Sequence, residues 1–131
     1  MTRINCVPPE ELTDKHLLAE YRELPRVFAL AYGAYRRGVD EAKLPKTYTL
    51  GKGHVLFFYD KLAYLEKRFN AIYLECRKRG WRCTYDRVPA LPMMPTSWQQ
   101  DWVPTPEALQ LNRQRIADRL ATRKDPYASL R

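Results

Sequence analysis

Apolar side chains recur every three or four residues from about Thr13 to Arg37, which is the period of an amphipathic α-helix. At about 100° per residue, one face of this helix carries Leu17, Tyr21, Leu24, Val27, Phe28 and Ala31. Thr13 or Asp14 is suited to cap its N-terminus, and Gly38 to end it. Pro25 lies inside the pattern, but the apolar phase continues across it. We therefore expect one bent helix, with a backbone carbonyl left free on the polar face at the bend.

The polar face of this helix has an unusual composition. Within an arc of roughly 120°, it carries Lys15, His16, Ala19, Arg22, Glu23 and Arg26. Glu23 is the only acid on this face, arginines flank it, and the small Ala19 leaves room in front of it. One interpretation is a solvated face with local ion pairs. The other is a functional site, because removal of Met1 ahead of a small residue would leave the free α-amine of Thr2 close to this helix in the chain.

A second periodic run follows the apolar residues 55–59. It predicts a helix from about Lys61 to Arg79, with Asp60 as N-cap and Gly80 just beyond the end. The apolar residues at spacings of three and four are Leu62, Leu65, Phe69, Ile72 and Cys76. Residues 55–59 are compatible with a short strand, but a capping residue follows them directly, so we expect a buried lead-in to the helix. The basic residues expected on the outside of the helix are Lys67, Arg68, Arg77, Lys78 and Arg79.

Residues 86–106 show no periodicity and contain five of the ten prolines, together with Trp98 and Trp102. A proline-rich segment with large apolar groups predicts a loop that packs over the core, and we interpret the two tryptophans as its anchors. Thr105 followed by Pro106 then begins a third helix, which extends to about Thr122.

The third helix carries a basic stripe of Arg115, Arg119 and Arg123, spaced by four residues. We expect the tail, residues 125–131, to fray. The sequence contains no strong strand pattern and no internal repeat. It therefore predicts an all-α fold, with residues 1–131 forming a single domain of three helices joined by long loops.

The charge of the chain restricts its partners. Twenty-three Lys and Arg against fifteen Asp and Glu give a net charge of +8 over 131 residues. This balance favours a polyanionic partner, nucleic acid before a membrane surface. No apolar run approaches the roughly 20 residues that span a bilayer, and the N-terminus lacks the hydrophobic core of a signal peptide.

Cysteine and histidine usage indicates neither a metal site nor a cofactor. The three cysteines include no C-x-x-C pair, and we interpret them as reduced thiols of a cytosolic protein. His16 and His54 are the only histidines, and neither a zinc-binding motif nor a phosphate-binding glycine loop is present. His54 precedes an apolar run, so we expect a structural hydrogen bond from it.

The polar face of the first helix suggests a particular chemistry. A free α-amine titrates at roughly 7.7–8.0, against roughly 10.4 for lysine, so a useful fraction is nucleophilic at neutral pH. An amine can attack a carbonyl-like carbon and form an imine. Glu23 could move protons and stabilise a cationic sugar, and the neighbouring arginines could hold phosphates. The combination fits attack by Thr2 at the anomeric carbon of a deoxynucleotide.

Three separated segments closely resemble the pyrimidine-dimer DNA glycosylases of the endonuclease V type, in order and in spacing. They are Thr2-Arg3-Ile4-Asn5, residues 19–28 (A-E-Y-R-E-L-P-R-V-F) and residues 53–62 (G-H-V-L-F-F-Y-D-K-L). The resemblance extends from residue 2 to about Arg123. It weakens at residues 6–12, in the loop of residues 32–48 and through the proline-rich segment.

The resemblance implies a small all-α enzyme that acts, without a cofactor, on double-stranded DNA containing cyclobutane pyrimidine dimers. In such enzymes the N-terminal threonine amine displaces the damaged base and forms an imine with the sugar, and β-elimination then cuts the strand. The duplex is sharply kinked, and the base opposite the lesion is flipped out. By this resemblance Thr2 is the nucleophile and Glu23 the catalytic acid. The DNA-contacting positions are Arg3, His16, Arg22, Arg26, Arg115, Arg119 and Arg123. A monomer in the cytoplasm, associated with the nucleoid when bound to DNA, is expected.

Two alternatives to this function stay open. One is the same chemistry on another base lesion or on an abasic site, because the aromatic-rich tail common in the family is reduced here to Tyr127. The other is a DNA-binding protein without catalysis, which retention of Met1 would favour. For His16, a capping or ion-pairing role stands beside the DNA contact.

Overall fold

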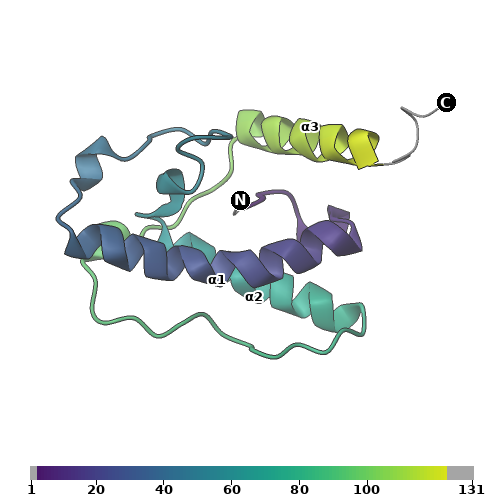
Figure 1. Cartoon of the computed structure of the whole chain (residues 1–131), viewed down its shortest axis with the longest axis horizontal. Coiled ribbons are helices and arrows are strands. Elements are labelled where there is room, and N and C mark those ends of the chain that lie inside the picture. Colours follow the sequence, from purple (N-terminus) through teal and green to yellow (C-terminus); the bar gives the residue numbers. More distant parts are fainter. Residues whose placement is uncertain (1–2, 124–131) are drawn as a thin grey trace.

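A computed structural model describes residues 3–123 of the chain. In this range, three α-helices follow one another: α1 (Asp14–Arg36), α2 (Leu62–Lys78) and α3 (Pro106–Arg123) (Figure 1). The connecting segments contain short 3-10 helices at Pro9–Glu11, Glu41–Lys43, Leu56–Phe58 and Thr96–Trp98, and residues 3–123 contain no β-strand. The predicted all-α fold of three helices joined by long loops is confirmed. Residues 125–131, predicted to fray, lie outside the described range.

Helix α1 has the predicted ends. The Thr13 hydroxyl oxygen accepts a hydrogen bond from the His16 backbone N–H (3.4 Å) and so caps the first turn. At the other end Gly38 adopts a φ of 81°, and the Val39 N–H donates to the Ala34 carbonyl (3.0 Å), which closes the last turn. The apolar face predicted from the spacing is buried throughout. The helix therefore lies on the core with the face that the sequence indicated.

Pro25 lies within one continuous helix, as predicted. Because proline has no N–H, the carbonyl of Tyr21 loses its donor within the helix. The Tyr85 hydroxyl donates to this oxygen instead (3.1 Å), and the rings of Tyr85 and Tyr21 stack with centroids 4.5 Å apart. The expectation of a free carbonyl was therefore wrong, since a residue that follows α2 supplies the missing donor.

Helix α2 ends as predicted but begins differently. Gly80 has a φ of 85°, and the Trp81 N–H donates to the Cys76 carbonyl (3.0 Å) beyond the last turn. At the start, Lys61 rather than Asp60 is the N-cap residue, and the Asp60 carboxylate pairs with the Lys61 ammonium (2.9 Å). Asp60 therefore does not cap the helix. The lead-in prediction for residues 55–59 is confirmed, since they contain the 3-10 helix at Leu56–Phe58.

The proline-rich segment is anchored to the core by its tryptophans. Trp98 is buried, and the Trp102 ring stacks on Tyr48 with centroids 5.8 Å apart. After this segment the Thr105 hydroxyl accepts the Ala108 N–H (3.0 Å), which confirms the predicted cap of α3.

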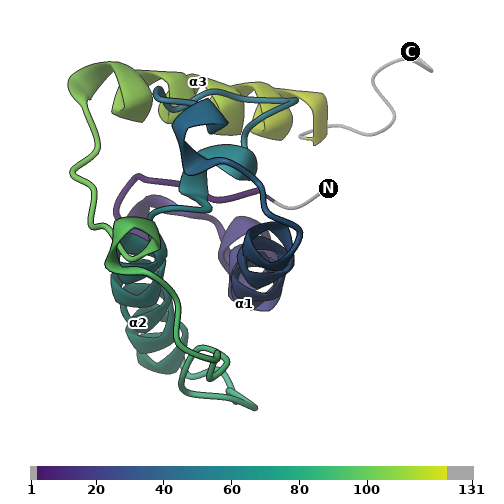
Figure 2. The ribbon, with the colours of Figure 1, turned by 90° about the vertical axis from the view of Figure 1, so that its left-hand side faces the viewer.

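The first residues of the chain form part of the interior. Helices α1 and α2 lie side by side, and α3 lies across them, with the N-terminal segment, residues 4–7, between α3 and the other two helices (Figure 2). All four of these residues are buried. No helix within residues 3–123 combines the length and the apolar character needed to cross a membrane.

Candidate active site

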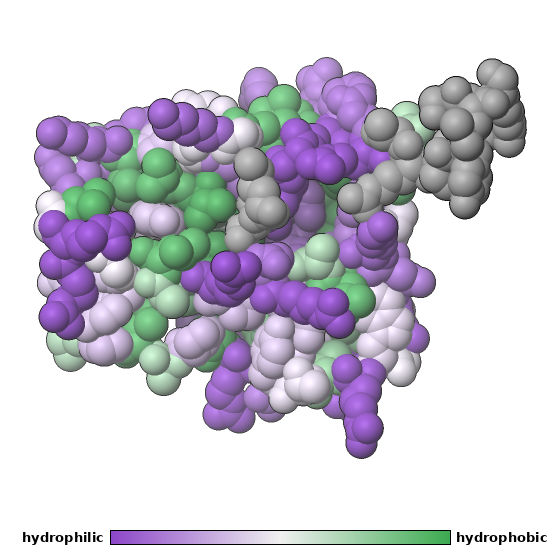
Figure 3. All heavy atoms as spheres, in the orientation of Figure 1, coloured by the Kyte–Doolittle hydropathy of each residue, from purple (hydrophilic) through white to green (hydrophobic). Residues whose placement is uncertain are grey.

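A cleft of about 320 Å³ lies between the start of the chain, the N-terminal half of α1 and the middle of α3. Its lining consists of Arg3, Asn5, Lys15, His16, Ala19, Glu20, Glu23, Arg115, Ile116 and Arg119. In the view of Figure 3, strongly hydrophilic side chains gather over α3 and over the N-terminal half of α1. The polar face of α1 and the basic stripe of α3, which are distant in sequence, therefore share one concave surface.

The structure brings five of the predicted site residues together in this cleft: Arg3, His16, Glu23, Arg115 and Arg119. Arg22 and Arg26 are exposed on α1 and are not among the lining residues. Arg26 nevertheless points back toward the cleft, because its Nη1 donates to Glu23 Oε2 (2.8 Å). Thr2 and the side chain of Arg123 lie outside what the structure describes.

Positive charge is concentrated at one end of the cleft. Burial, followed by the nearby charges of Arg115 and Arg119, lowers the pKa of Arg3 below its usual value. An arginine keeps its proton at neutral pH regardless, so the shift indicates that the charged Arg3 side chain is held at a cost, first from its burial and then from the two neighbouring guanidinium groups. The buried Nε of Arg115 also has no hydrogen-bond partner among the described residues. A bound anion such as a phosphate would relieve both costs.

A second acid, Glu20, also lines the cleft, although it does not lie on the polar face of α1, where Glu23 remains the only acid. Glu20 is only 1% exposed. Arg68 Nε donates to its Oε2 (2.8 Å), and Arg68 Nη2 donates to its Oε1 (3.0 Å). The Asn5 side-chain amide donates to the same Oε1 (2.8 Å). The carboxylate of Glu20 is therefore held within the protein by a bidentate ion pair.

Arg68 was expected on the outside of α2, and that expectation was wrong. Its guanidinium is buried with Glu20 and also donates to the Val7 carbonyl. Arg79, likewise expected outside, has a partly buried side chain that pairs with Asp14 and Glu75. These arginines join α2 to the residues that precede α1 and to α1 itself.

The spacing of residues along α1 and α2 could have indicated the buried ion pair of Glu20 and Arg68. Arg68 stands three residues after Leu65 and four before Ile72, which places it on the apolar face of α2. Glu20 occupies the corresponding position on α1, between Leu17 and Leu24. A single acid and a single base, each at a buried position of its helix, indicate a pair, since an isolated buried charge is very costly.

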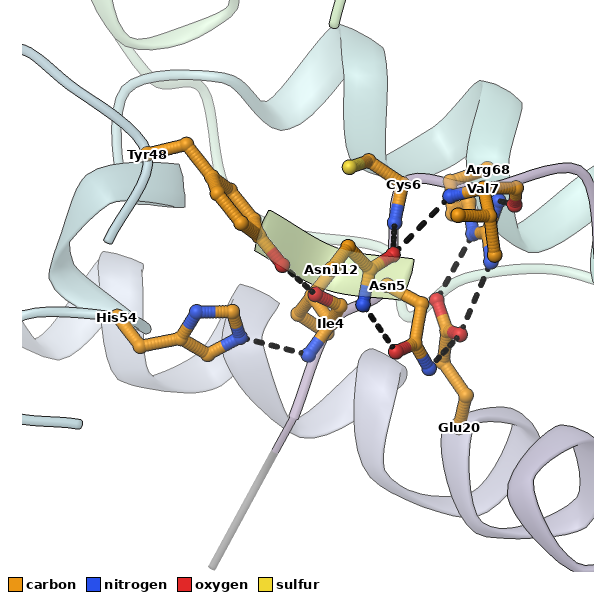
Figure 4. Close-up of polar contacts among 9 residues, drawn as sticks. All are labelled: Ile4, Asn5, Cys6, Val7, Glu20, Tyr48, His54, Arg68 and Asn112. Atoms are coloured by element: carbon orange, nitrogen blue, oxygen red, sulfur yellow. Dashed lines mark hydrogen bonds and ion pairs between the residues drawn. The ribbon is translucent and has the colours of Figure 1, made fainter. Parts of the chain in front are cut away.

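His54 has the structural role predicted for it. Its Nε2 accepts the backbone N–H of Ile4 (2.9 Å), and its Nδ1 lies 2.8 Å from the Thr49 carbonyl oxygen (Figure 4). The ring can satisfy both contacts only as the neutral tautomer with the proton on Nδ1. Burial, more than any other cause, lowers the pKa of His54 and favours this neutral form. The start of the chain is thus attached to the core at its fourth residue.

Comparison with known families gives a match to this chain. The model of a family described as pyrimidine dimer DNA glycosylase matches residues 1–87 of the 131-residue chain. The matched range contains the N-terminal segment, α1 and α2, and so includes Arg3, His16 and Glu23 of the cleft. Helix α3, with Arg115 and Arg119, lies beyond the match.

Proposed function

Because this chain belongs to the pyrimidine dimer DNA glycosylase family, we propose that it excises cyclobutane pyrimidine dimers with the α-amine of Thr2 as nucleophile. The same amine forms an imine with the sugar, and β-elimination then cuts the strand. The observation that carries this proposal is the cleft, which joins the start of the chain to Glu23 on one side and to Arg115 and Arg119 on the other.

The attachment of Ile4 supports the assignment of the nucleophile. The Ile4 N–H is hydrogen-bonded to His54, and Arg3, the residue before it, lines the cleft. The two residues that join the proposed amine to Ile4 span at most about 7 Å when fully extended, which limits the reach of the amine. With a pKa of roughly 7.7–8.0, a fraction of this amine is uncharged at neutral pH. Its lone pair attacks the anomeric carbon, while the base leaves with the electron pair of the glycosidic bond and takes up a proton.

Glu23 is the group best placed to move protons in this sequence of steps. Its side chain is 32% exposed, and Arg26 orients the carboxylate from one side. The carboxylate accepts a proton from the attacking amine and stabilises the cationic sugar as the base departs. The sugar ring then opens, because the bond between the anomeric carbon and the ring oxygen breaks and that oxygen takes up a proton as the imine forms. Glu23 next removes a proton from the sugar carbon beside the imine. The electron pair then expels the phosphate at the next carbon, which cuts the strand.

The positive end of the cleft supports DNA as the substrate. Arg3, Arg115 and Arg119 would hold phosphates near the damaged nucleotide. The exposed Arg22 and Arg26 would extend this contact along the strand. His16 and Arg123 complete the proposed DNA surface. The proposal further includes a single-domain monomer without cofactor that acts on damaged double-stranded DNA in the cytoplasm, at the nucleoid.

Borohydride trapping tests the mechanism, because reduction of an imine links protein and DNA permanently. On a duplex with one cyclobutane dimer, we expect an adduct that peptide mapping assigns to residue 2, in protein whose intact mass shows the loss of Met1. A variant with one residue added ahead of Thr2 should form no adduct, although it retains a free α-amine. Thr2→Ser should react normally, since the hydroxyl is not the nucleophile.

The competing outcomes are equally specific. Lys15 lines the cleft, so an adduct on Lys15 would move the nucleophile and overturn the assignment of Thr2. Tight binding to the dimer duplex with neither an adduct nor a strand cut would favour a DNA-binding protein without catalysis.

A further inference from the structure

The N-terminal segment, residues 4–7, crosses the interior without a backbone partner among the described residues. Instead, side chains from separate parts of the chain form hydrogen bonds with backbone N–H and carbonyl groups of this segment (Figure 4). His54 accepts the Ile4 N–H, the Tyr48 hydroxyl donates to the Ile4 carbonyl (3.4 Å), and Arg68 donates to the Val7 carbonyl. The position of this segment therefore depends on individual side chains and not on a sheet or a helix.

Asn112 of α3 makes three further hydrogen bonds to this segment, two to its backbone and one to the side chain of Asn5. It is completely buried. Its Oδ1 accepts the N–H groups of two consecutive residues, Cys6 (2.7 Å) and Val7 (3.1 Å). Its Nδ2 donates to Asn5 Oδ1 (2.8 Å). One amide thus holds three successive residues of the segment.

The orientation of both amides follows from the buried ion pair. The Glu20 carboxylate can only accept hydrogen bonds, so Asn5 has to present its NH₂ to Glu20 and its oxygen to Asn112. Asn112 then has to present its NH₂ to Asn5 and its oxygen to the backbone. Only a side chain with both a donor and an acceptor fits this position. An aspartate of the same size would place an oxygen against Asn5 Oδ1.

Asn112 also lies on the face of α3 that lines the cleft. Arg115 and Arg119 follow it by three and seven residues, which places all three on one face of the helix. Since residues 4–7 lie between α3 and the other helices (Figure 2), Asn112 joins the helix that carries these arginines to the segment that leads to Thr2.

We propose that Asn112 is a positioning residue for the reaction. By holding Cys6 and Val7 on α3, it fixes the separation between a phosphate bound by Arg115 and Arg119 and the amine of Thr2. This inference rests on the proposed function, because it requires the Thr2 amine as nucleophile. Displacement of a reacting group by about 1 Å can slow a reaction about 100-fold. Loss of Asn112 should therefore slow imine formation and leave the affinity for DNA unchanged.

The test compares Asn112→Ala and Asn112→Asp with Leu109→Ala, a control on the same helix. Leu109 packs against the core but makes none of these hydrogen bonds. Imine formation is measured by borohydride trapping in a single turnover, at saturating abasic-site duplex and below the unfolding temperature of every variant. We expect Asn112→Ala to be about 100-fold slower and Asn112→Asp to be slowed too. The dissociation constant should stay near the parent value for all variants, and Leu109→Ala should react at the parent rate.

Amide hydrogen exchange gives a readout that does not depend on the chemistry. In Asn112→Ala the N–H groups of Cys6 and Val7 should lose protection, while those of α2 keep theirs. If Asn112→Ala does not fold by circular dichroism, Asn112→Ser replaces it, because a water can occupy the vacated volume and accept the two N–H groups. The same slowing is expected for that variant.

Two results would overturn the positioning role. One is a parent-like rate in the Asn112 variants. The other is equal slowing in Leu109→Ala, which would indicate a general effect of loosening α3. A parent protein that forms no adduct at residue 2 contradicts the proposed function itself. Unchanged exchange at Cys6 and Val7 in the variant contradicts the contact to Asn112, whatever the nucleophile is.

Discussion

Two glutamates of α1, three residues apart and both lining the cleft, have opposite environments. Glu20 is 1% exposed and accepts hydrogen bonds from Arg68 and Asn5. The Glu23 side chain is 32% exposed and pairs with the exposed Arg26. Glu20 falls on the apolar face of the helix and Glu23 on its polar face. The same residue type is therefore part of the core at one position and accessible to a substrate one turn later.

The same division applies to the whole cleft. Its floor, Asn5 and Glu20, is buried and belongs to the hydrogen-bond network that holds the start of the chain. Its rim, Glu23, Arg115 and Arg119, is open to solvent to differing degrees. Substitutions in the floor should therefore lower stability, whereas substitutions in the rim should lower activity or affinity. The following variants test this separation.

For the rim, Glu23→Gln should give the largest effect. It keeps the size and hydrogen bonding of the side chain but removes the charge that accepts protons. Excision of a cyclobutane dimer, measured in a single turnover, should fall by roughly 10² to 10⁴-fold. The free energy of unfolding should change by less than about 1 kcal/mol, because the pair with Arg26 is exposed. Near-normal excision by this variant would remove Glu23 from the mechanism.

For the floor, Glu20→Gln should mainly affect stability. It leaves the buried charge of Arg68 uncompensated, which should lower the free energy of unfolding by about 3–5 kcal/mol. Urea denaturation measures this loss, with Glu23→Gln as the matched control on the same helix. Replacing both partners, in Glu20→Leu with Arg68→Met, should recover much of it. An equal loss in Glu20→Gln and Glu23→Gln would contradict the division into floor and rim.

On α3, Arg119→Glu tests whether the rim binds phosphates. Binding of the parent to undamaged duplex should depend on salt with a log–log slope of about −4 to −7. The variant should bind all sequences more weakly, with a slope that is shallower by about 1. Lys78→Glu, at the exposed end of α2, is the control for charge reversal and should keep the parent slope. A flat salt response of the parent would contradict phosphate binding altogether.

His54 should give a smaller, pH-dependent effect on stability. Its pKa is lowered in the folded protein, chiefly by burial and also by the charges of Arg3 and Arg115. Below an unfolded pKa of about 6.5, the unfolded chain therefore binds a proton that the folded protein does not. The free energy of unfolding should fall as the pH drops from 6.5 toward the folded pKa, by at most about 1.4 kcal/mol per pH unit. It should change little above pH 7.

Urea denaturation between pH 5 and pH 8 measures this dependence. The control is His54→Gln, whose amide can accept the Ile4 N–H but does not titrate, so the His54 component should be absent. A parent stability that rises on acidification through this range would show that His54 is not held neutral.

Much of the fold could be predicted from the sequence because its determinants are local. The caps at Thr13 and Thr105 and the glycines that end α1 and α2 act within one turn of the chain. The buried and exposed faces of α1 followed from a spacing of three and four residues. By itself, the sequence therefore determined the three helices and the apolar residues that α1 and α2 bury, together with the basic charge and the resemblance to a glycosylase family.

Only the tertiary structure decided which of these residues meet. Glu20 and Arg68 are 48 residues apart, and Asn5 and Asn112 are 107 apart. The donor that replaces the missing N–H of Pro25 comes from Tyr85, 64 residues from its acceptor. No local pattern specifies such pairs, because a buried polar group requires a partner but its own position in the chain does not say which one. The cleft has the same origin, since it forms only where α3 lies across the N-terminal segment and faces the polar side of α1.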